Sequence, residues 1–312
     1  MANIRLYIEQ SLEISSQVID LTDQQHHYLF NVMRSRDGDT IRVFNGIDGE
    51  WLAIISTFVD GHIAGAKLEP GSLIKSQTKT SIDARLENSN TNKLIYSKTN
   101  KLNKKKQKYN LILRDKIKAM PPASSKKTYL VFAPFKAYSP SFVVQKATEL
   151  GVDQIIPIQT QRTVIKSVNH EKLKISAIEA AEQSERLTLP IVAAKFQTYT
   201  QIIAELKKTE RSKIVLFFDT DSPEAISVQN LFQWIDSAKN KIAESILEFK
   251  QISYYIFIGP EGGFSQEERD EMMKFSFESN SVSKSCIVSL GELVLRAETA
   301  FIAALSLIQF VK

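Results

Sequence analysis

The hydrophobic pattern of residues 4–69 consists of short apolar runs separated by turn residues. Residues 41–44, apolar except for Arg42, and residues 51–55 flank the turn sequence 45–49, which contains Asn, Asp and two Gly. Such a pattern predicts strands joined by tight turns. Residues 23–34 differ, because their apolar positions recur at helical spacing and predict a helix. Several short strands with one helix indicate a small barrel.

From residue 128 onward, short apolar runs alternate with longer stretches of helical period. Ser139 and Pro140 are typical of a helix start, and Gly151 is typical of a helix end. Strands and helices alternating at this spacing predict an α/β domain whose parallel sheet is covered by helices on both faces. The predicted strands are 129–133, 155–158, 214–218 and 252–258, and the predicted helices are 139–150, 170–186 and 227–249.

Residues 75–127 differ in composition from both neighbouring regions. They carry 15 Lys and Arg against 3 Asp and Glu, whereas the regions on either side are slightly acidic. Their apolar clusters, such as 94–96 and 111–113, are short and isolated, and we expect them to bury too little area to offset the entropy of ordering. We therefore predict a barrel domain at 1–74, a basic, disordered linker at 75–127 and an α/β domain at 128–312. The linker is either a solvated connection or an arm that grips nucleic acid.

Bulk properties exclude other classes of protein. No apolar run approaches the ~18 residues of a membrane-spanning helix, and residues 1–6 lack the pattern of a secretion signal. The single cysteine, Cys286, excludes an internal disulfide framework and is expected to be a buried core thiol. The four histidines, at 26, 27, 62 and 170, have no metal-ligand spacing. We expect a cytoplasmic protein without metal or membrane association.

Candidate chemistry begins at the end of the predicted strand 252–258. The sequence Gly259-Pro260-Glu261-Gly262-Gly263-Phe264 follows, and Ser265 with Glu268 is predicted to form a capping box that opens the next helix. Glycines permit close approach of a ligand to the backbone, and open α/β sheets bind ligands at the carboxyl ends of their strands. The loop lacks the order of the dinucleotide and P-loop motifs. It is therefore either another kind of ligand-binding loop or a plain turn.

A second segment, residues 288–300, also passes from a strand through a glycine turn into a helix. The helix is predicted to carry Arg296, Glu298 and Thr299 in its first turn and to be apolar nearly all round as far as Phe310. A helix without a polar face is buried on every side, often partly by a second subunit. Arg296 and Glu298 are either functional residues or a local ion pair.

These two segments resemble the RsmE family of 16S rRNA (uracil-N3)-methyltransferases, within the SPOUT class. The resemblance extends to residues 145–152, 182–190 and 26–34, so it covers nearly everything outside 75–127. It implies a PUA-like N-terminal RNA-binding domain, a SPOUT domain with a deep trefoil knot, and a homodimer. It also implies S-adenosyl-L-methionine as cofactor and the 16S rRNA of the small ribosomal subunit as partner.

The resemblance also implies the site residues. Arg296 would stabilise negative charge on the uracil ring, and Glu298 would accept the N3 proton. The residues expected to bind the cofactor are Phe218, Ile258, Gly259, Pro260, Glu261, Gly262, Gly263, Ser289, Leu290, Gly291 and Leu295. Those expected to contact the RNA are His27, Arg34, Arg186 and Thr299.

Three segments depart from the pattern of the family. Glu292-Leu293 stands where the family usually has Pro-Arg or similar, Glu185-Arg186 stands for the usual Gly-Arg, and residues 136–142 also differ. These departures concern substrate contacts more than the cofactor pocket. Two alternatives stay open: a SPOUT enzyme that methylates another RNA nucleotide, and a non-catalytic RNA-binding protein with a decayed pocket.

Overall fold

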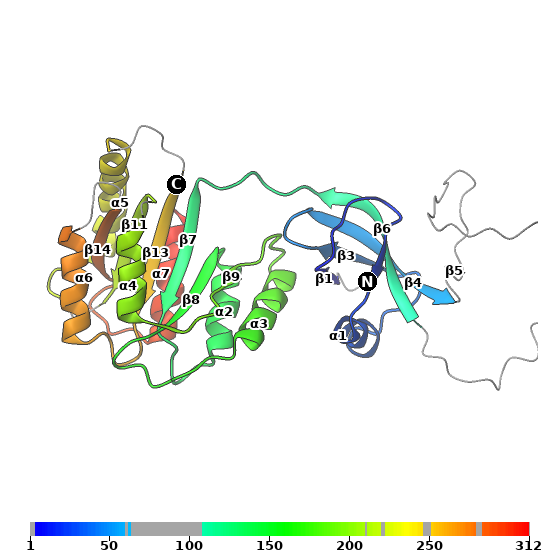
Figure 1. Ribbon diagram of the computed structural model, residues 1–312, viewed down its shortest axis with the longest axis horizontal. Helices are drawn as coiled ribbons and strands as arrows, with labels where there is room; N and C mark the ends of the chain where they lie inside the picture. The colour runs from blue at the N-terminus through cyan, green and yellow to red at the C-terminus, as the bar shows by residue number, and fades with distance from the viewer. Residues whose placement is uncertain are drawn as a thin grey trace, which may run out of the picture. The chain divides into compact units, whose positions relative to one another are not determined.

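A computed structural model describes residues 4–59, 62–63, 108–209, 211–219, 222–245, 251–278 and 283–311 (Figure 1). The chain divides into two compact units, which are considered one at a time. The first consists of Met1–Ile4, Leu12–Val43 and Trp51–Ile117, and the second of Arg5–Ser11, Phe44–Glu50 and Lys118–Lys312.

The N-terminal part of the chain forms a six-stranded sheet, with the order β1-β3-β4-β6-β2 and with β5 paired to β4. The predicted strands 41–44 and 51–55 are β3 and β4. The predicted helix at 23–34 begins as α1, where Thr22 and Gln25 form a capping box, and continues as the π-helical turn η1. The elements are β1 Arg5–Tyr7, β2 Val18–Asp20, α1 Asp23–His27, η1 Tyr28–Val32, β3 Thr40–Phe44, β4 Glu50–Val59, β5 His62–Ile63 and β6 Lys108–Lys118.

The structure corrects the linker prediction at its C-terminal end. Strand β6 falls inside the predicted linker and lies between β4 and β2, with Ile112 opposite Val18. Leu111, Ile112 and Leu113 are all buried, because strands distant in sequence cover a cluster that is isolated along the chain. Strand β7 begins at Lys126, before the predicted boundary. Residues 119–125 of the predicted linker connect β6 to β7, and residues 75–107 lie outside the described residues.

The second unit contains an eight-stranded sheet with the order β10-β8-β7-β13-β11-β14-β12, and β9 pairs with β8. The pairs along this order are parallel, which confirms the predicted α/β class. The strand order does not by itself establish the trefoil knot, which stays a prediction. The strands are β7 Lys126–Phe132, β8 Gln154–Gln159, β9 Ile191–Val192, β10 Gln197–Thr198, β11 Lys213–Phe218, β12 Ile226–Ser227, β13 Ile252–Ile258 and β14 Ser283–Ser289.

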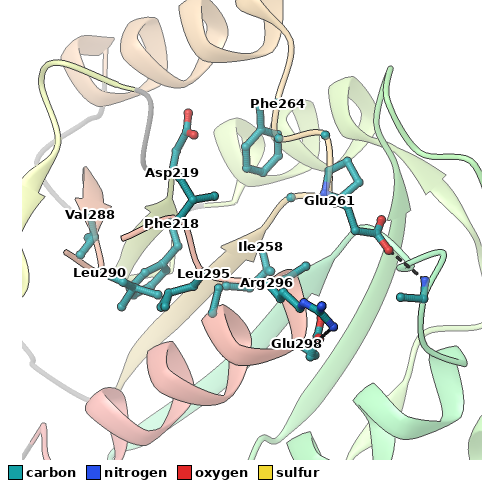
Figure 2. A pocket seen from close by; sticks show the side chains of 18 residues that line it. Phe218, Asp219, Ile258, Glu261, Phe264, Val288, Leu290, Leu295, Arg296 and Glu298 are labelled. Carbon is teal, nitrogen blue, oxygen red and sulfur yellow. Dashed lines mark hydrogen bonds and ion pairs between the residues drawn. The ribbon is translucent and has the colours of Figure 1, made fainter. Parts of the chain in front are cut away.

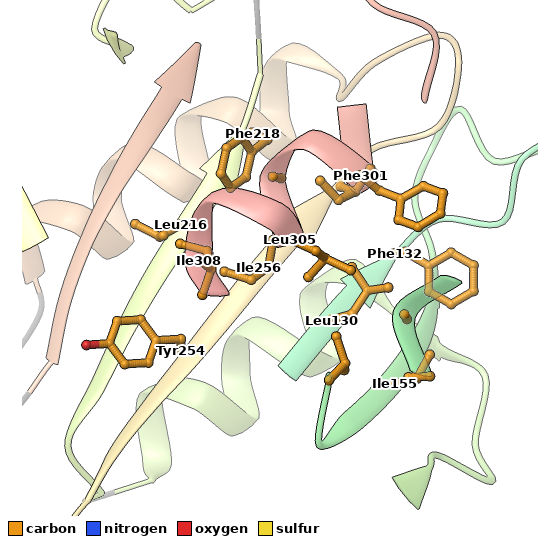
Figure 3. Packing of buried hydrophobic residues seen from close by; sticks show 14 of the residues in the cluster. Leu130, Phe132, Ile155, Leu216, Phe218, Tyr254, Ile256, Phe301, Leu305 and Ile308 are labelled. Atoms are coloured by element: carbon orange, nitrogen blue, oxygen red, sulfur yellow. The ribbon is translucent and has the colours of Figure 1, made fainter. Parts of the chain in front are cut away.

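Helices cover both faces of this sheet. Alternate strand residues such as Leu216 and Ile256 join the apolar cluster that contains α2, α3, α5 and α7, whereas Val215 and Phe257 join the cluster that contains α4 and α6. Figure 3 shows Phe301, Leu305 and Ile308 of α7 among the strand residues of the first cluster. The helices are α2 Pro140–Glu149, α3 His170–Gln183, α4 Tyr199–Lys208, α5 Val228–Ala243, α6 Gln266–Glu278 and α7 Ala297–Gln309.

The helix ends follow local sequence signals. The side chain of Ser139 accepts a hydrogen bond at the start of α2, and Gly151 beyond its end has φ +75°. Helix α3 ends at Gln183, before the predicted Arg186, because Glu185 takes the left-handed conformation with φ +58°. None of the described helices is both long enough and apolar enough to span a bilayer.

Candidate active site

A cavity of about 460 Å³ lies where β11, β13 and β14 end and α7 begins (Figure 2). Because parallel strands end at the same edge of a sheet, this is the position at which open α/β sheets bind ligands. Of the predicted cofactor-binding residues, only Ser289 and Gly291 do not line the cavity. Both predicted catalytic residues, Arg296 and Glu298, do line it.

The loop after β13 forms one wall and is shaped by its glycines. A Cβ atom on Gly259 would come within 3.0 Å of the Phe264 ring, so the backbone passes directly over that buried ring. Gly263 has φ +68°, and its N–H donates to the carbonyl of Pro260 at 2.9 Å. The predicted capping box is confirmed, because Ser265 N–H donates to Glu268 at 2.9 Å and Glu268 N–H donates to the Ser265 hydroxyl at 3.2 Å.

Glu261 joins this loop to the chain after β7. Its Oε1 accepts hydrogen bonds from the backbone N–H groups of Lys136, at 2.5 Å, and Ala137, at 3.0 Å (Figure 2). Ala137 lines the cavity as well. The predicted cofactor-binding residue Glu261 therefore also fixes the segment at 136–142 that departs from the family pattern.

Asp219 is a lining residue that the sequence analysis missed. It directly follows β11, and its carboxylate pairs with the Arg269 guanidinium, Nε to Oδ2, at 2.7 Å. A polar residue directly after a buried parallel strand is the signal that could have identified it. The other lining residues that were missed are Ala137, Phe264, Val288, Val294, Ala297 and Ala300.

The structure corrects the position of Arg296. It is the N-cap of α7, with ψ 150°, and not part of its first turn. Its side chain is 82% exposed, and its Nη1 lies 4.0 Å from Oε1 of Glu298, which is 13% exposed. An exposed pair at this distance contributes little to stability. The guanidinium therefore remains accessible beside the cavity, next to a more buried carboxylate.

None of the predicted RNA-contacting residues lines the cavity. His27 and Arg34 are exposed residues of the first unit, and Thr299 is exposed on α7 without lining the cavity. Arg186 lies elsewhere in the second unit, where it donates to the Thr148 carbonyl and the Thr188 hydroxyl, both at 3.0 Å. Burial lowers the pKa of Arg186.

The charged groups at the cavity are mixed in sign and depth. Glu298 is 13% exposed, the carboxylate of Asp219 is 4% exposed and pairs with Arg269, and the lining residues Glu261 and Arg296 are exposed. The carboxylate of Glu298, which lies 4.0 Å from Nη1 of Arg296, suits a cationic group of a ligand. Among the described residues, no group of three or more His, Cys, Asp and Glu could hold a metal ion. Cys286 is buried in β14, as predicted, and burial raises the pKa of its thiol.

Two family models match the chain. The model of the RNA methyltransferase domain matches residues 122–309, and that of the RNA methyltransferase PUA domain matches residues 21–57. The PUA match falls on the N-terminal sheet and confirms the predicted PUA-like part.

Several curated proteins resemble the chain along much of its length. Ribosomal RNA small subunit methyltransferase E of Rickettsia conorii is 29% identical over 97% of this chain and 93% of its own. The protein of the same name from Bacillus subtilis is 30% identical over 59% of this chain and 66% of its own.

Solved structures share the fold. The ribosomal RNA small subunit methyltransferase E of Neisseria gonorrhoeae, bound to S-adenosyl methionine, is 20% identical with a TM-score of 0.63, over 98% of this chain and 97% of its own. A putative methyltransferase of Legionella pneumophila, in complex with the same cofactor, is 23% identical with a TM-score of 0.63, over 99% and 98%.

Proposed function

The chain belongs to the RNA methyltransferase domain family, and from that membership we propose that it methylates N3 of a uridine in the 16S rRNA of the small ribosomal subunit, with S-adenosyl-L-methionine as methyl donor. The names of the curated relatives support the choice of RNA. The observation that carries the proposal is the cavity formed by the loops after β11, β13 and β14 and by the start of α7.

The residues of the cavity fit this cofactor. A volume of about 460 Å³ lies within the range of small-molecule sites. Phe218, Leu290 and Leu295 offer apolar walls for an adenine ring, and the carboxylate of Glu298 suits a positively charged sulfonium. The glycine loop lets backbone groups approach the ligand closely, because side chains are absent there.

The bound cofactor supplies a methyl group on a sulfonium, which N3 of the uridine attacks while the carbon–sulfur bond breaks and sulfur keeps the electron pair. N3 loses its proton, for which Glu298 is the acceptor. Arg296 stabilises the negative charge that develops on the uracil oxygens. Both residues stand at the start of α7, so the rigid helix holds them beside the reacting atoms.

The proposal includes the assembly and the location of the protein. The first unit, with His27 and Arg34, contacts the RNA, and two copies of the chain form a homodimer. Leu293, before α7 in the chain, is 78% exposed, and Phe310, directly after α7, is 76% exposed. Exposed apolar side chains such as these favour association. The ribosomal substrate places the enzyme in the cytoplasm.

Calorimetry with S-adenosyl-L-methionine and a methylation assay on unmethylated small-subunit particles test this function together. We expect saturable binding and one methyl group on N3 of a uridine. A protein with a decayed pocket would release no heat of binding. Transfer to another nucleotide would support the alternative SPOUT activity and overturn the uridine assignment.

A further inference from the structure

The loop after β8 brings a second arginine to the cavity wall. The side chain of Arg162 lies against Gly262, where a Cβ atom would meet its Cδ at 3.5 Å, and its Nη1 donates to the Gly262 carbonyl at 2.6 Å. Gly262 lines the cavity, whereas Arg162 does not line it and is exposed. The guanidinium is thus held next to a residue of the cavity wall.

A buried carboxylate holds this loop in place. Glu268 is 4% exposed, and its two oxygens accept hydrogen bonds from different loops, from Gln161 N–H at 2.8 Å and from Ser265 N–H at 2.9 Å. The Tyr199 hydroxyl donates to the carbonyl of Glu268 at 3.1 Å. Glu268 therefore clamps the residue before Arg162 to the loop that forms the cavity wall.

The turn that carries Arg162 is itself tightly closed. Thr160 N–H donates to the Thr163 hydroxyl at 2.9 Å, and the two hydroxyl oxygens lie 2.7 Å apart. Both threonines are buried. A surface arginine on such a turn keeps its place, so less entropy is lost when it binds a ligand.

The guanidinium of Arg162 has more N–H donors than its hydrogen bond to Gly262 uses. An arginine has five N–H donors, and in the described part of the chain Arg162 makes no ion pair. Lys136 and Arg296 are also exposed beside the glycine loop, together with the carboxylates of Glu261 and Glu267, and Glu267 interacts electrostatically with Arg162. A planar guanidinium suits phosphate oxygens in particular.

We propose that Arg162 binds a backbone phosphate of the RNA beside the target uridine, and that Glu268 is the positioning residue that sets its place. The inference rests on the proposed function and adds a substrate contact to it. Phosphate contacts fix the register of a protein on its nucleic acid without reading sequence. Arg162 thereby holds the target base over the cavity.

The test compares Arg162→Ala, Arg162→Lys and the matched control Lys174→Ala, which removes an exposed lysine on α3. Binding to unmethylated small-subunit particles is measured at several KCl concentrations. For Arg162→Ala we expect affinity to fall roughly tenfold or more, as for the loss of a charged hydrogen bond. The slope of log affinity against log salt should become shallower by about one unit. Arg162→Lys should keep the slope and regain part of the affinity, and the control should match the wild type.

Glu268→Gln tests the positioning role. Alone it should weaken RNA binding, whereas in the Arg162→Ala background it should change neither the RNA affinity nor the salt slope further. A merely structural role would lower RNA affinity to the same extent in both backgrounds, and it would overturn the assignment of Glu268.

Calorimetry with S-adenosyl-L-methionine distinguishes failure of the proposed phosphate contact from failure of the proposed function. We expect Arg162→Ala to bind the cofactor as the wild type does, within about twofold, because the proposed contact is to RNA. A salt slope equal to that of the wild type would overturn the phosphate contact. Loss of cofactor affinity with an unchanged slope would assign Arg162 to the carboxylate of the cofactor instead. If the wild type itself neither binds the cofactor nor methylates RNA, the proposed function fails, whereas the outcomes above leave it standing.

Discussion

At the scale of single residues, the glycines of the loop after β13 are not equivalent. A Cβ atom on Gly259 would meet the buried ring of Phe264 at 3.0 Å, whereas one on Gly262 would make only an ordinary van der Waals contact with Arg162 at 3.5 Å. The first glycine is required for packing against a ring that cannot move easily, and the second is not.

Gly259→Ala should therefore weaken cofactor binding and lower the melting temperature, because overpacking of this kind costs about 1–3 kcal/mol. Gly262→Ala is the matched control and should bind the cofactor with nearly normal affinity. Calorimetry with S-adenosyl-L-methionine and thermal unfolding measure both effects. Equal behaviour of the two variants would show that the contact with Phe264 does not shape the site.

A second prediction at the scale of single residues concerns the methylation rate of Arg296 variants. Arg296→Ala should reduce methylation by roughly a hundredfold or more, the scale of losing one charge-stabilising donor. Its melting temperature and cofactor affinity should change little, because the side chain is 82% exposed. Arg296→Lys should recover activity only in part, since an ammonium cannot reproduce the planar fork. Single-turnover methylation measures the loss, and near-normal turnover of Arg296→Ala would move the catalytic role to another residue.

Most lining residues of the cavity could be predicted, because two contiguous sequence segments supply them. Asp219 was missed, since it stands alone after β11 and only the sheet order brings it beside β13 and β14. The N-cap position of Arg296 was also missed, because only the structure shows that its backbone is extended. Sequence spacing does not give the direction of a side chain at a helix boundary.

At the scale of elements, β1 and α3 meet through a titratable group. Glu182 of α3 accepts a hydrogen bond from the Tyr7 N–H at 2.9 Å. Burial is the main reason why the pKa of this carboxyl is raised from 4.5 to about 7. The folded protein therefore prefers neutral Glu182, and the stability that this preference provides is complete below pH 4.5 and is lost as the pH rises through about 7.

Glu182→Gln should remove this pH dependence, because the amide stays neutral and its oxygen can still accept from Tyr7. At pH 8 the variant should be more stable than the wild type, by on the order of 2 kcal/mol, and near pH 4.5 the two should agree. Urea unfolding between pH 4.5 and 8 measures the difference, with Glu244→Gln on the exposed end of α5 as control. Parallel pH curves for the wild type and Glu182→Gln would contradict the account.

The sequence did not predict strand β6 or helix α4, and each omission has a physical reason. Strand β6 was not predicted because basic residues flank its apolar residues 111–113. These residues are covered by pairing with β2 and β4, which are distant in sequence. Helix α4 has 10 residues, as α2 has, but it lacks the Pro at its start and the Gly beyond its end that marked α2. The strands at 155–158, 214–218 and 252–258 were predictable, because central parallel strands are continuous apolar runs.

At the scale of the whole molecule, the apolar character of α7 bears on assembly. One face of the helix is buried in its own chain, but Ile302 and Leu307 are only half-buried, and Phe310, directly after the helix, is exposed. Phe310→Glu should therefore weaken the proposed homodimer while the fold is retained. Ile191→Glu, on β9, is the matched control for an exposed apolar residue and should leave the dimer intact. Analytical ultracentrifugation measures both, and a monomeric wild type would contradict the dimer.

The central claim is that the cavity at the ends of β11, β13 and β14 transfers a methyl group to N3 of a uridine. The most direct measurement incubates the protein with unmethylated small-subunit particles and isotopically labelled S-adenosyl-L-methionine, followed by mass spectrometry of the digested 16S rRNA. The account predicts one labelled N3-methyluridine, formed by the wild type and nearly absent with Arg296→Ala. Absence of label with the wild type, or label on another atom or nucleotide, would contradict it.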